Sequence, residues 1–140
     1  MSSSDPVSPG PTDAHQPPSD RTEVRRGANR AVYDPAEIRA ILDAAPIAHV
    51  GVSTPDGPIV LPMAHGRIDD TLYLHGSAAN AMLRAGRGVE VCATITLVDG
   101  LVLARSVFHN SMNYRSVVVR GEARVVDDAG EFEAGLRAIT

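Results

Sequence analysis

The chain contains 140 residues with a formal net charge of −4, and 44% of its residues are hydrophobic. This length allows one domain with a single core, and the acidic balance argues against nucleic acid as the main partner. Lysine is absent, which excludes Schiff-base chemistry and the lysine-dependent phosphate loop, and no apolar run approaches the roughly 18 residues of a membrane span, so we expect no membrane partner.

The chain opens on a stretch rich in proline and serine. Its first 20 residues carry half of the 10 prolines and almost nothing apolar. Such a stretch cannot bury enough surface to offset the entropy of ordering it. We therefore expect residues 1–22 to be disordered and residues 23–140 to form the domain.

A helix and three strands are expected next. Asp34 is a good N-cap, Pro35 suits the first helical position, and Pro46 ends the helix. Beyond it the apolar period changes to that of strands, which are joined by turns into a meander. The three strands are Ile47–Ser53, Ile59–His65 and Thr71–His75.

The second half of the chain is also rich in strand-forming residues. Ser77 can cap a short helix over Ala78–Arg87, and Asp128 with Glu131 opens a last helix. Between the two helices lie three β-rich runs: Val89–Leu97, Leu101–Phe108 and Tyr114–Val126. About six strands, short helices and no repeated βαβ spacing predict a mainly β protein, either an antiparallel barrel or a sandwich.

Residues Leu97–Ala123 combine strand-forming runs with many polar side chains. The polar residues are Arg105, His109, Asn110, Ser111, Asn113, Tyr114, Arg115 and Ser116. Polar groups packed among buried strands each need a partner or cost about 1–3 kcal/mol. We therefore expect this stretch to contribute to a ligand site.

A second candidate site is the corner formed by His75, Gly76 and Ser77, where a strand leads into a helix. A helix start offers unpaired N–H groups and a partial positive charge, both of which suit a phosphate. An ordinary N-cap is the alternative.

The histidines and the cysteine indicate no metal site. None of His49, His65, His75 and His109 shows a ligand spacing, and no cysteine or acidic residue joins them in a known pattern. His49 alternates with apolar residues, so we expect a satisfied core or interface side chain. Cys92 is the only cysteine and is typical of a small core residue in the reducing cytoplasm.

Five motifs, in this order, resemble one family: Arg30–Asp34, Ala48–Val52, Leu72–Ser77, Asp99–Ser106 and Phe108–Val117. Together they closely resemble the pyridoxamine 5'-phosphate oxidase-related flavin-binding proteins, in the branch that includes nitroimidazole-resistance proteins. The resemblance covers about Val24 to Thr140. It implies a split β-barrel of about six antiparallel strands that forms a homodimer and holds FMN in two clefts between subunits.

The resemblance also implies site residues. Pro62, Met63, Ala64 and His65 would form the strand beside the isoalloxazine ring. His75, Gly76 and Ser77 would lie at the ribityl-phosphate end, with His75 near the flavin as the catalytic residue. Arg115 and Ser116 match the strand that closes the cleft, and Tyr114 and His65 are further candidates for a proton donor.

The chain departs from the family pattern in two places. Family members usually carry an arginine or lysine in the first helical turn after the His-Gly-Ser segment, where this chain has Asn80 and Ala81. Arg84, one turn further on, is the candidate substitute for that phosphate contact. The chain is also shorter than the family, so we expect a C-terminally shortened domain.

These observations favour an FMN-dependent oxidoreductase. It would reduce a small electron-poor molecule, such as a nitroimidazole, by hydride or two-electron transfer with NAD(P)H as the donor. Alternatives are a non-catalytic carrier of flavin or haem on the same barrel, and a degenerate dimerisation domain that binds nothing. Deazaflavin and haem are the alternative cofactors.

Overall fold

The structure is a computed structural model that describes residues 16–77 and 88–140. The chain divides into two compact units, Met1–Ile38 and Arg39–Thr140. The described residues of the first unit form two 3-10 turns, Asp20–Thr22 and Ala28–Arg30, and begin helix α1 (Pro35–Ala44). The boundary expected at residue 22 remains a prediction, and the helix expected over Ala78–Arg87 lies outside the described residues.

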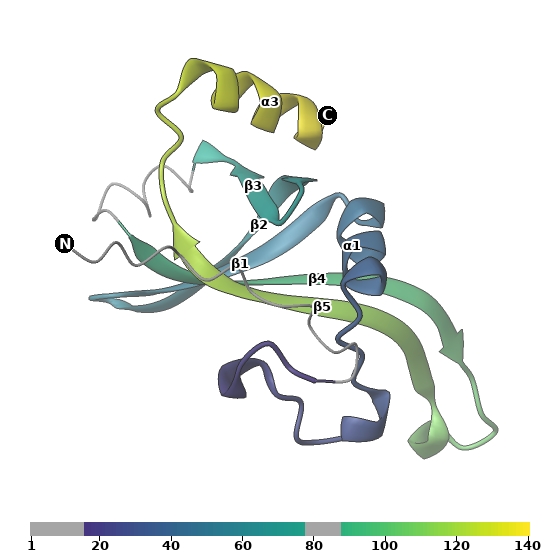
Figure 1. Cartoon of the computed structure of the whole chain (residues 1–140). Coiled ribbons are helices and arrows are strands. Elements are labelled where there is room, and N and C mark those ends of the chain that lie inside the picture. The colour runs from purple at the N-terminus through teal and green to yellow at the C-terminus, as the bar shows by residue number, and fades with distance from the viewer. Residues whose placement is uncertain (1–15, 78–87) are drawn as a thin grey trace. The chain divides into compact units, whose positions relative to one another are not determined.

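The second unit is built on one antiparallel sheet of five strands. The strands are β1 (Ile47–Thr54), β2 (Gly57–Ile68), β3 (Thr71–His75), β4 (Val89–Val102) and β5 (Ser111–Ala123). They lie in the order β3-β2-β1-β4-β5, and long, coiled β4 and β5 run together along their whole length (Figure 1). The predicted mainly β, antiparallel class is confirmed.

Sharp turns join the first three strands, as the sequence predicts. In the β1–β2 turn, Gly57 has a φ of 114°, a conformation that favours glycine. The Thr54 hydroxyl donates to the Gly57 carbonyl across the turn, at 2.6 Å. Asp69, in the β2–β3 turn, has a φ of 50°, which aspartate tolerates better than most residues.

Within the described residues the strand count of about six is corrected to five. Of the expected strand Leu101–Phe108, only Leu101 and Val102 are extended, as the end of β4, and a 3-10 turn forms at Val107–His109. Val89–Leu97 and Leu101–Phe108 were expected to be separated by a turn at Asp99-Gly100. Instead β4 continues through this point, with a register shift between Val98 and Gly100 where it pairs with β5. The continuous partner strand lets β4 absorb the extra residue as a bulge, so the chain need not reverse.

The core lies on one face of the sheet, here called the inner face. Alternation places every second side chain there. The buried apolar residues are Ala48, Val50, Val52, Met63, Ala93, Ile95 and Val117 from the strands and Leu42 from α1. The strand positions that alternate with these, among them His49, Pro62 and Thr94, face the other side, here called the outer face.

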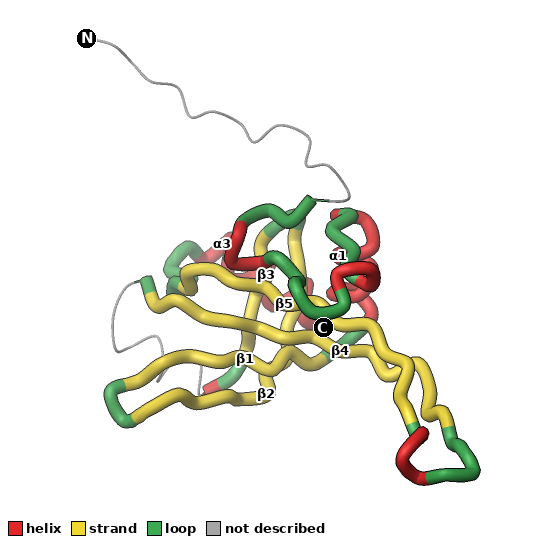
Figure 2. Tube along the Cα trace, turned by 90° about the horizontal axis from the view of Figure 1, so that it is seen from below, coloured by secondary structure: helices red, strands yellow, loops and turns green. Residues whose placement is uncertain are grey.

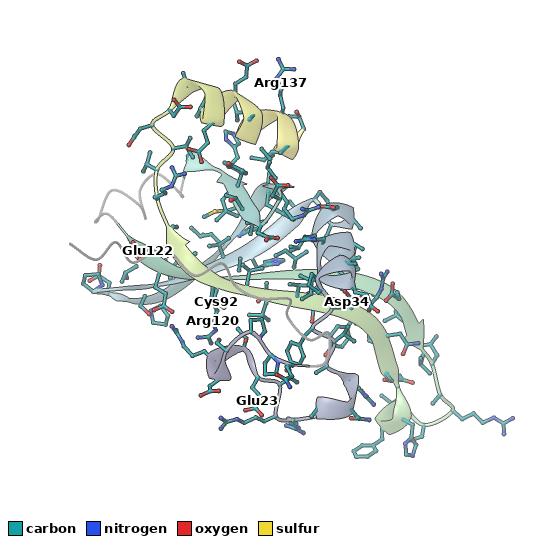
Figure 3. The ribbon with its side chains drawn as sticks, viewed as in Figure 1. Glu23, Asp34, Cys92, Arg120, Glu122 and Arg137 are labelled. Carbon is teal, nitrogen blue, oxygen red and sulfur yellow. The ribbon has the colours of Figure 1, made fainter. Side chains whose placement is uncertain are left out.

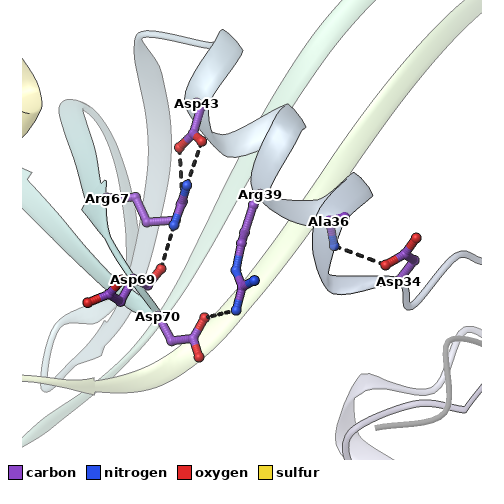
Figure 4. Close-up of polar contacts among 7 residues, drawn as sticks. All are labelled: Asp34, Ala36, Arg39, Asp43, Arg67, Asp69 and Asp70. Carbon is purple, nitrogen blue, oxygen red and sulfur yellow. Dashed lines mark hydrogen bonds and ion pairs between the residues drawn. The ribbon is translucent and has the colours of Figure 1, made fainter. Parts of the chain in front are cut away.

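The second half of α1 is tied to β2 and to the β2–β3 turn by ion pairs (Figure 4). Arg67 binds Asp43 through two nitrogens, and Arg39 Nη2 lies 2.7 Å from Asp70 Oδ1. The hydrogen bonds from Arg67 lower the pKa of Asp43. At the start of the helix, Asp34 Oδ1 accepts from the Ala36 N–H at 3.0 Å, which confirms Asp34 as the N-cap.

Helix α3 (Ala129–Ile139) packs on β2 and β3. The Asp128 side chain accepts from the Glu131 N–H at 2.8 Å, which confirms the predicted cap. The helix approaches the sheet so closely that a Cβ on Gly66 would collide with the Ala138 carbonyl. Tyr73 on β3 donates to Glu131 at 3.2 Å. Within the described residues, no helix is both long and apolar enough to cross a membrane.

Candidate cofactor-binding face

The strand expected to lie beside a flavin ring divides its side chains between the two faces. Met63 and His65 are 4% and 5% exposed and point inward. Pro62 is exposed and Ala64 half-buried, and both point outward. Because neighbours on a strand alternate, only Pro62 and Ala64 can present side chains to a ligand on the outer face.

The strand register brings other candidates alongside these two. His75 on β3 lies directly opposite Ala64, and His49 on β1 lies directly opposite Pro62. Directly opposed residues of an antiparallel pair project from the same face. The outer face therefore carries two exposed imidazoles, one beside each of the two small apolar side chains.

The outer face continues across β4 and β5. Thr94 lies opposite both His49 and Val118, and Ser116 lies opposite Thr96. Cys92 and Arg120, a directly opposed pair, project on the same side of these strands (Figure 3). Ser116, a predicted cofactor residue, therefore shares the outer face with Pro62, Ala64 and His75.

His65 occupies a different environment from the other candidates. Its Nε2 lies 3.0 Å from the Leu42 carbonyl, and because a carbonyl only accepts, Nε2 carries the proton. Nδ1 is buried and has no hydrogen-bond partner in the described part of the chain. His65 therefore links β2 to the end of α1 through this hydrogen bond.

The phosphate corner is described only in part. Gly76 and Ser77 follow β3 directly, with Ser77 exposed. Gly76 has no positive φ, and a Cβ there would meet only Met63 Cγ, at 3.9 Å, so its conformation does not require glycine. The other two residues predicted for this corner, Asn80 and Arg84, lie outside the described residues.

The far end of the β4–β5 hairpin, residues 98–114, forms an arm that extends beyond the other strands (Figure 2). The apolar residues at its tip are almost fully exposed: Leu103 80%, Val107 84% and Phe108 91%. The polar residues 105–116 are exposed as well. The premise that these polar groups are packed among buried strands is therefore wrong for the single chain, because the arm has no second layer over it.

Tyr114 and Arg115 lie where the arm meets the sheet. Tyr114 is 60% exposed and shares the outer face with Ser116. Arg115 faces the other way and holds Asp99 by hydrogen bonds that lower the pKa of that carboxyl and raise the pKa of the guanidinium. Arg115 is thus already paired with an anion.

The outer face fits a planar, partly polar ring better than it fits a metal ion. Pro62 and Ala64 are small and apolar, so an aromatic ligand can lie over them, while His49 and His75 can donate or accept hydrogen bonds at its edges. Among residues 16–77 and 88–140, no three His, Cys, Asp or Glu side chains gather as a metal site requires.

His49 is the candidate that sequence reasoning did not place in the site. Its exposure excludes the core alternative. The signal was present in the alternation itself: Ala48, Val50 and Val52 are buried on the inner face, so the residue between the first two must point outward.

Helix α3 covers the outer face at Gly66 and Tyr73, and leaves Pro62 and His75 exposed. One antiparallel, coiled sheet with short helices is consistent with a small split β-barrel. The chain belongs to the pyridoxamine 5'-phosphate oxidase family, since the family model of that description matches residues 34–140. The expected membership and the split-barrel fold are thereby confirmed. The comparison with curated proteins gives no match.

Three solved structures are similar to the chain. Flavocytochrome Anf3 from Azotobacter vinelandii is 42% identical, with a TM-score of 0.76 over 86% of this chain and 56% of that one. An FAD- and haem-binding protein from Mycobacterium smegmatis is 33% identical, with a TM-score of 0.65 over 75% and 53%. A candidate 5-nitroimidazole antibiotic resistance protein from Bacteroides thetaiotaomicron is 32% identical, with a TM-score of 0.60 over 76% and 64%.

The chain spans 53% to 64% of the length of these three structures.

Proposed function

We propose that the chain binds FMN on the outer face and acts as an oxidoreductase, passing electrons from NAD(P)H to a small electron-poor molecule. The register that places Pro62, Ala64 and His75 on one face carries the proposal. The family, and the likeness to proteins described as a flavocytochrome and as FAD- and haem-binding, support a flavin. The likeness to a candidate nitroimidazole-resistance protein supports a nitroaromatic substrate.

Each residue of the face has a role in this proposal. Bound flavin supplies the two-electron chemistry, while the protein supplies position and protons. Pro62 and Ala64 lie under the ring, and Gly76 and Ser77 offer backbone and hydroxyl donors to the phosphate. His75 is the proton donor, because its exposed imidazole adjoins Ala64 and imidazole exchanges protons near neutral pH.

We further propose that a second copy of the chain covers the arm and forms one wall of the cofactor cleft. Phe108, Val107 and Leu103 are at least 80% exposed, and several exposed large apolar side chains on one short segment are typical of an interaction site. Light scattering should give the mass of a dimer, and Phe108→Ser should shift it toward the monomer. A wild-type monomer at all concentrations would contradict this part of the proposal.

Titration with flavins tests the main proposal. FMN should bind with quenched fluorescence and a shifted visible band, and riboflavin should bind at least about tenfold more weakly because it lacks the phosphate. FAD and deazaflavin titrations measure selectivity. NAD(P)H with a nitroimidazole should then give turnover. Unchanged flavin fluorescence and absorbance at saturating FMN would overturn the proposal.

A second candidate function is an electron carrier that holds haem together with flavin. The descriptions of the two structures at 42% and 33% identity favour it. His49 and His75 are exposed imidazoles, and imidazole is a common axial ligand of haem iron. Added haem should then give a sharp Soret band and no nitroimidazole turnover, whereas a spectrum equal to that of free haem would exclude this function.

A further inference from the structure

His49 projects from the middle of β1 into the outer face without a polar partner. It is exposed and forms no hydrogen bond with any residue that the structure describes. The residues directly opposite it are Pro62 on β2 and Thr94 on β4. Among the described residues, no hydrogen bond of the fold therefore depends on the imidazole of His49.

The surroundings of His49 are mostly apolar. Ile47, two residues earlier on the same face, is 43% exposed, Val60 is 62% exposed and Val118 is 54% exposed. Each lies on the outer face, as the pairs Ile47–Ala64, Gly51–Val60 and Thr94–Val118 show. Exposed apolar side chains around a polar group that can donate and accept are typical of sites for flat heteroaromatic ligands.

Among the residues that the structure describes, few charged groups share the face of the sheet with His49. On β4 the nearest titratable residue of this face is Cys92, and on β5 it is Arg120, opposite Cys92. On β3 it is His75, reached across Ala64. No carboxylate lies directly opposite His49 on either neighbouring strand.

We propose that His49 is a further residue of the flavin site, contacting the bound ring from β1 while His75 contacts it from β3. The inference rests on the proposed function. It makes the spectrum and the binding of flavin depend on the imidazole of His49. It also gives different roles to the two histidines of the β1–β2 hairpin, because His65 forms a hydrogen bond in the core and His49 contacts the ligand.

His49→Leu tests this inference, because leucine keeps an apolar side chain and cannot form a hydrogen bond. Wild-type protein with FMN should show a shifted visible band. In His49→Leu the affinity should fall about tenfold, and the band should move toward that of free FMN. His49→Gln keeps hydrogen-bonding capacity and should recover part of the affinity.

Ser53→Ala is the matched control, since Ser53 is exposed on the same strand and face but lies four residues away at the turn. Circular dichroism and thermal unfolding verify that each variant is folded. If wild type binds no FMN, the proposed function fails. If wild type binds FMN and His49→Leu keeps both its affinity and its visible spectrum, only the role of His49 is overturned.

Discussion

Arg115 on β5 binds Asp99, at the bulge of β4, through two guanidinium nitrogens. Its Nε lies 3.0 Å from Oδ2 and its Nη2 lies 2.8 Å from Oδ1. The side chains are 57% and 38% exposed, so the pair contributes little to stability. The pair bears instead on ligand binding. Asp99 and a cofactor anion would compete for Arg115, because an anion that bound the guanidinium would have to displace Asp99.

The first prediction concerns that competition and rests on the proposed dimer, because Arg115 faces away from the outer face of its own chain and reaches FMN only in the cleft of the second copy. Asp99→Asn frees Arg115, so we expect FMN to bind about threefold more tightly in a fluorescence titration, the gain expected from removing one exposed counter-ion. Glu133→Gln is the charge-matched control, because it breaks an exposed ion pair with Arg137 on α3. An equal effect of both variants would assign the gain to net charge and remove Arg115 from the site.

The second prediction concerns His75 as proton donor. His75→Ala should lower the rate of substrate reduction by about 10²-fold or more, the usual contribution of a general acid, and should change FMN affinity much less. Stopped-flow absorbance of the flavin measures the rate, and fluorescence quenching measures the affinity. Parallel losses of rate and affinity would make His75 a binding residue.

The third prediction separates His65 from the outer face. His65→Ala removes the donor to the Leu42 carbonyl and leaves a cavity, so we expect a loss of about 2–4 kcal/mol in the free energy of unfolding. The FMN affinity of the folded protein should stay within about twofold. Urea unfolding and FMN titration measure the two quantities. A variant with normal stability and abolished FMN binding would contradict the inward placement.

The fourth prediction concerns the docking of α3. Gly66→Ala should destabilise the protein by about 1–3 kcal/mol, because the added methyl group meets backbone atoms of Ala138 and Ile139 that cannot move without shifting the helix. Gly121→Ala is the control, since a Cβ there meets nothing within 4 Å. Thermal unfolding of the two variants should differ by several degrees, and equal melting temperatures would refute the tight fit.

The fifth prediction concerns pH. Arg67 lowers the folded-state pKa of Asp43 below its unfolded value, so this carboxylate stabilises the fold above about pH 4 and ceases to do so as pH falls through the folded-state pKa. Asp43→Asn should therefore be slightly less stable than wild type at pH 7, and the difference should vanish near pH 2. Urea unfolding over this range measures it. A difference that grows on acidification would contradict the assignment.

Local signals predicted much of the fold. The caps Asp34 and Asp128 and the turn before Gly57 act over a few residues, so the sequence specifies them almost alone. Strand β3 begins and ends where the sequence predicted, at Thr71 and His75. Turn signals failed at Asp99-Gly100, because whether such a pair reverses the chain or bulges depends on a partner strand more than ten residues away.

Predicting the site demanded more than motif order. The alternation of β2 excludes the side chains of Met63 and His65 from the outer face, although Pro62 and Ala64 remain on it. The same alternation in β1 predicts that His49 points away from the core. Its position beside Pro62, however, follows only from the register of β1 with β2. Register depends on contacts between strands, which a single chain pattern does not reveal.

The bulge at Asp99 determines how mutations can change the arm. A bulge bends a strand and increases its local twist. The direction of the arm is therefore set at the base of the hairpin and hardly depends on Phe108 or its neighbours. Exchanges at the tip would alter its surface without changing its direction. Deletion of Asp99 would remove the bulge and so change the direction of the whole tip.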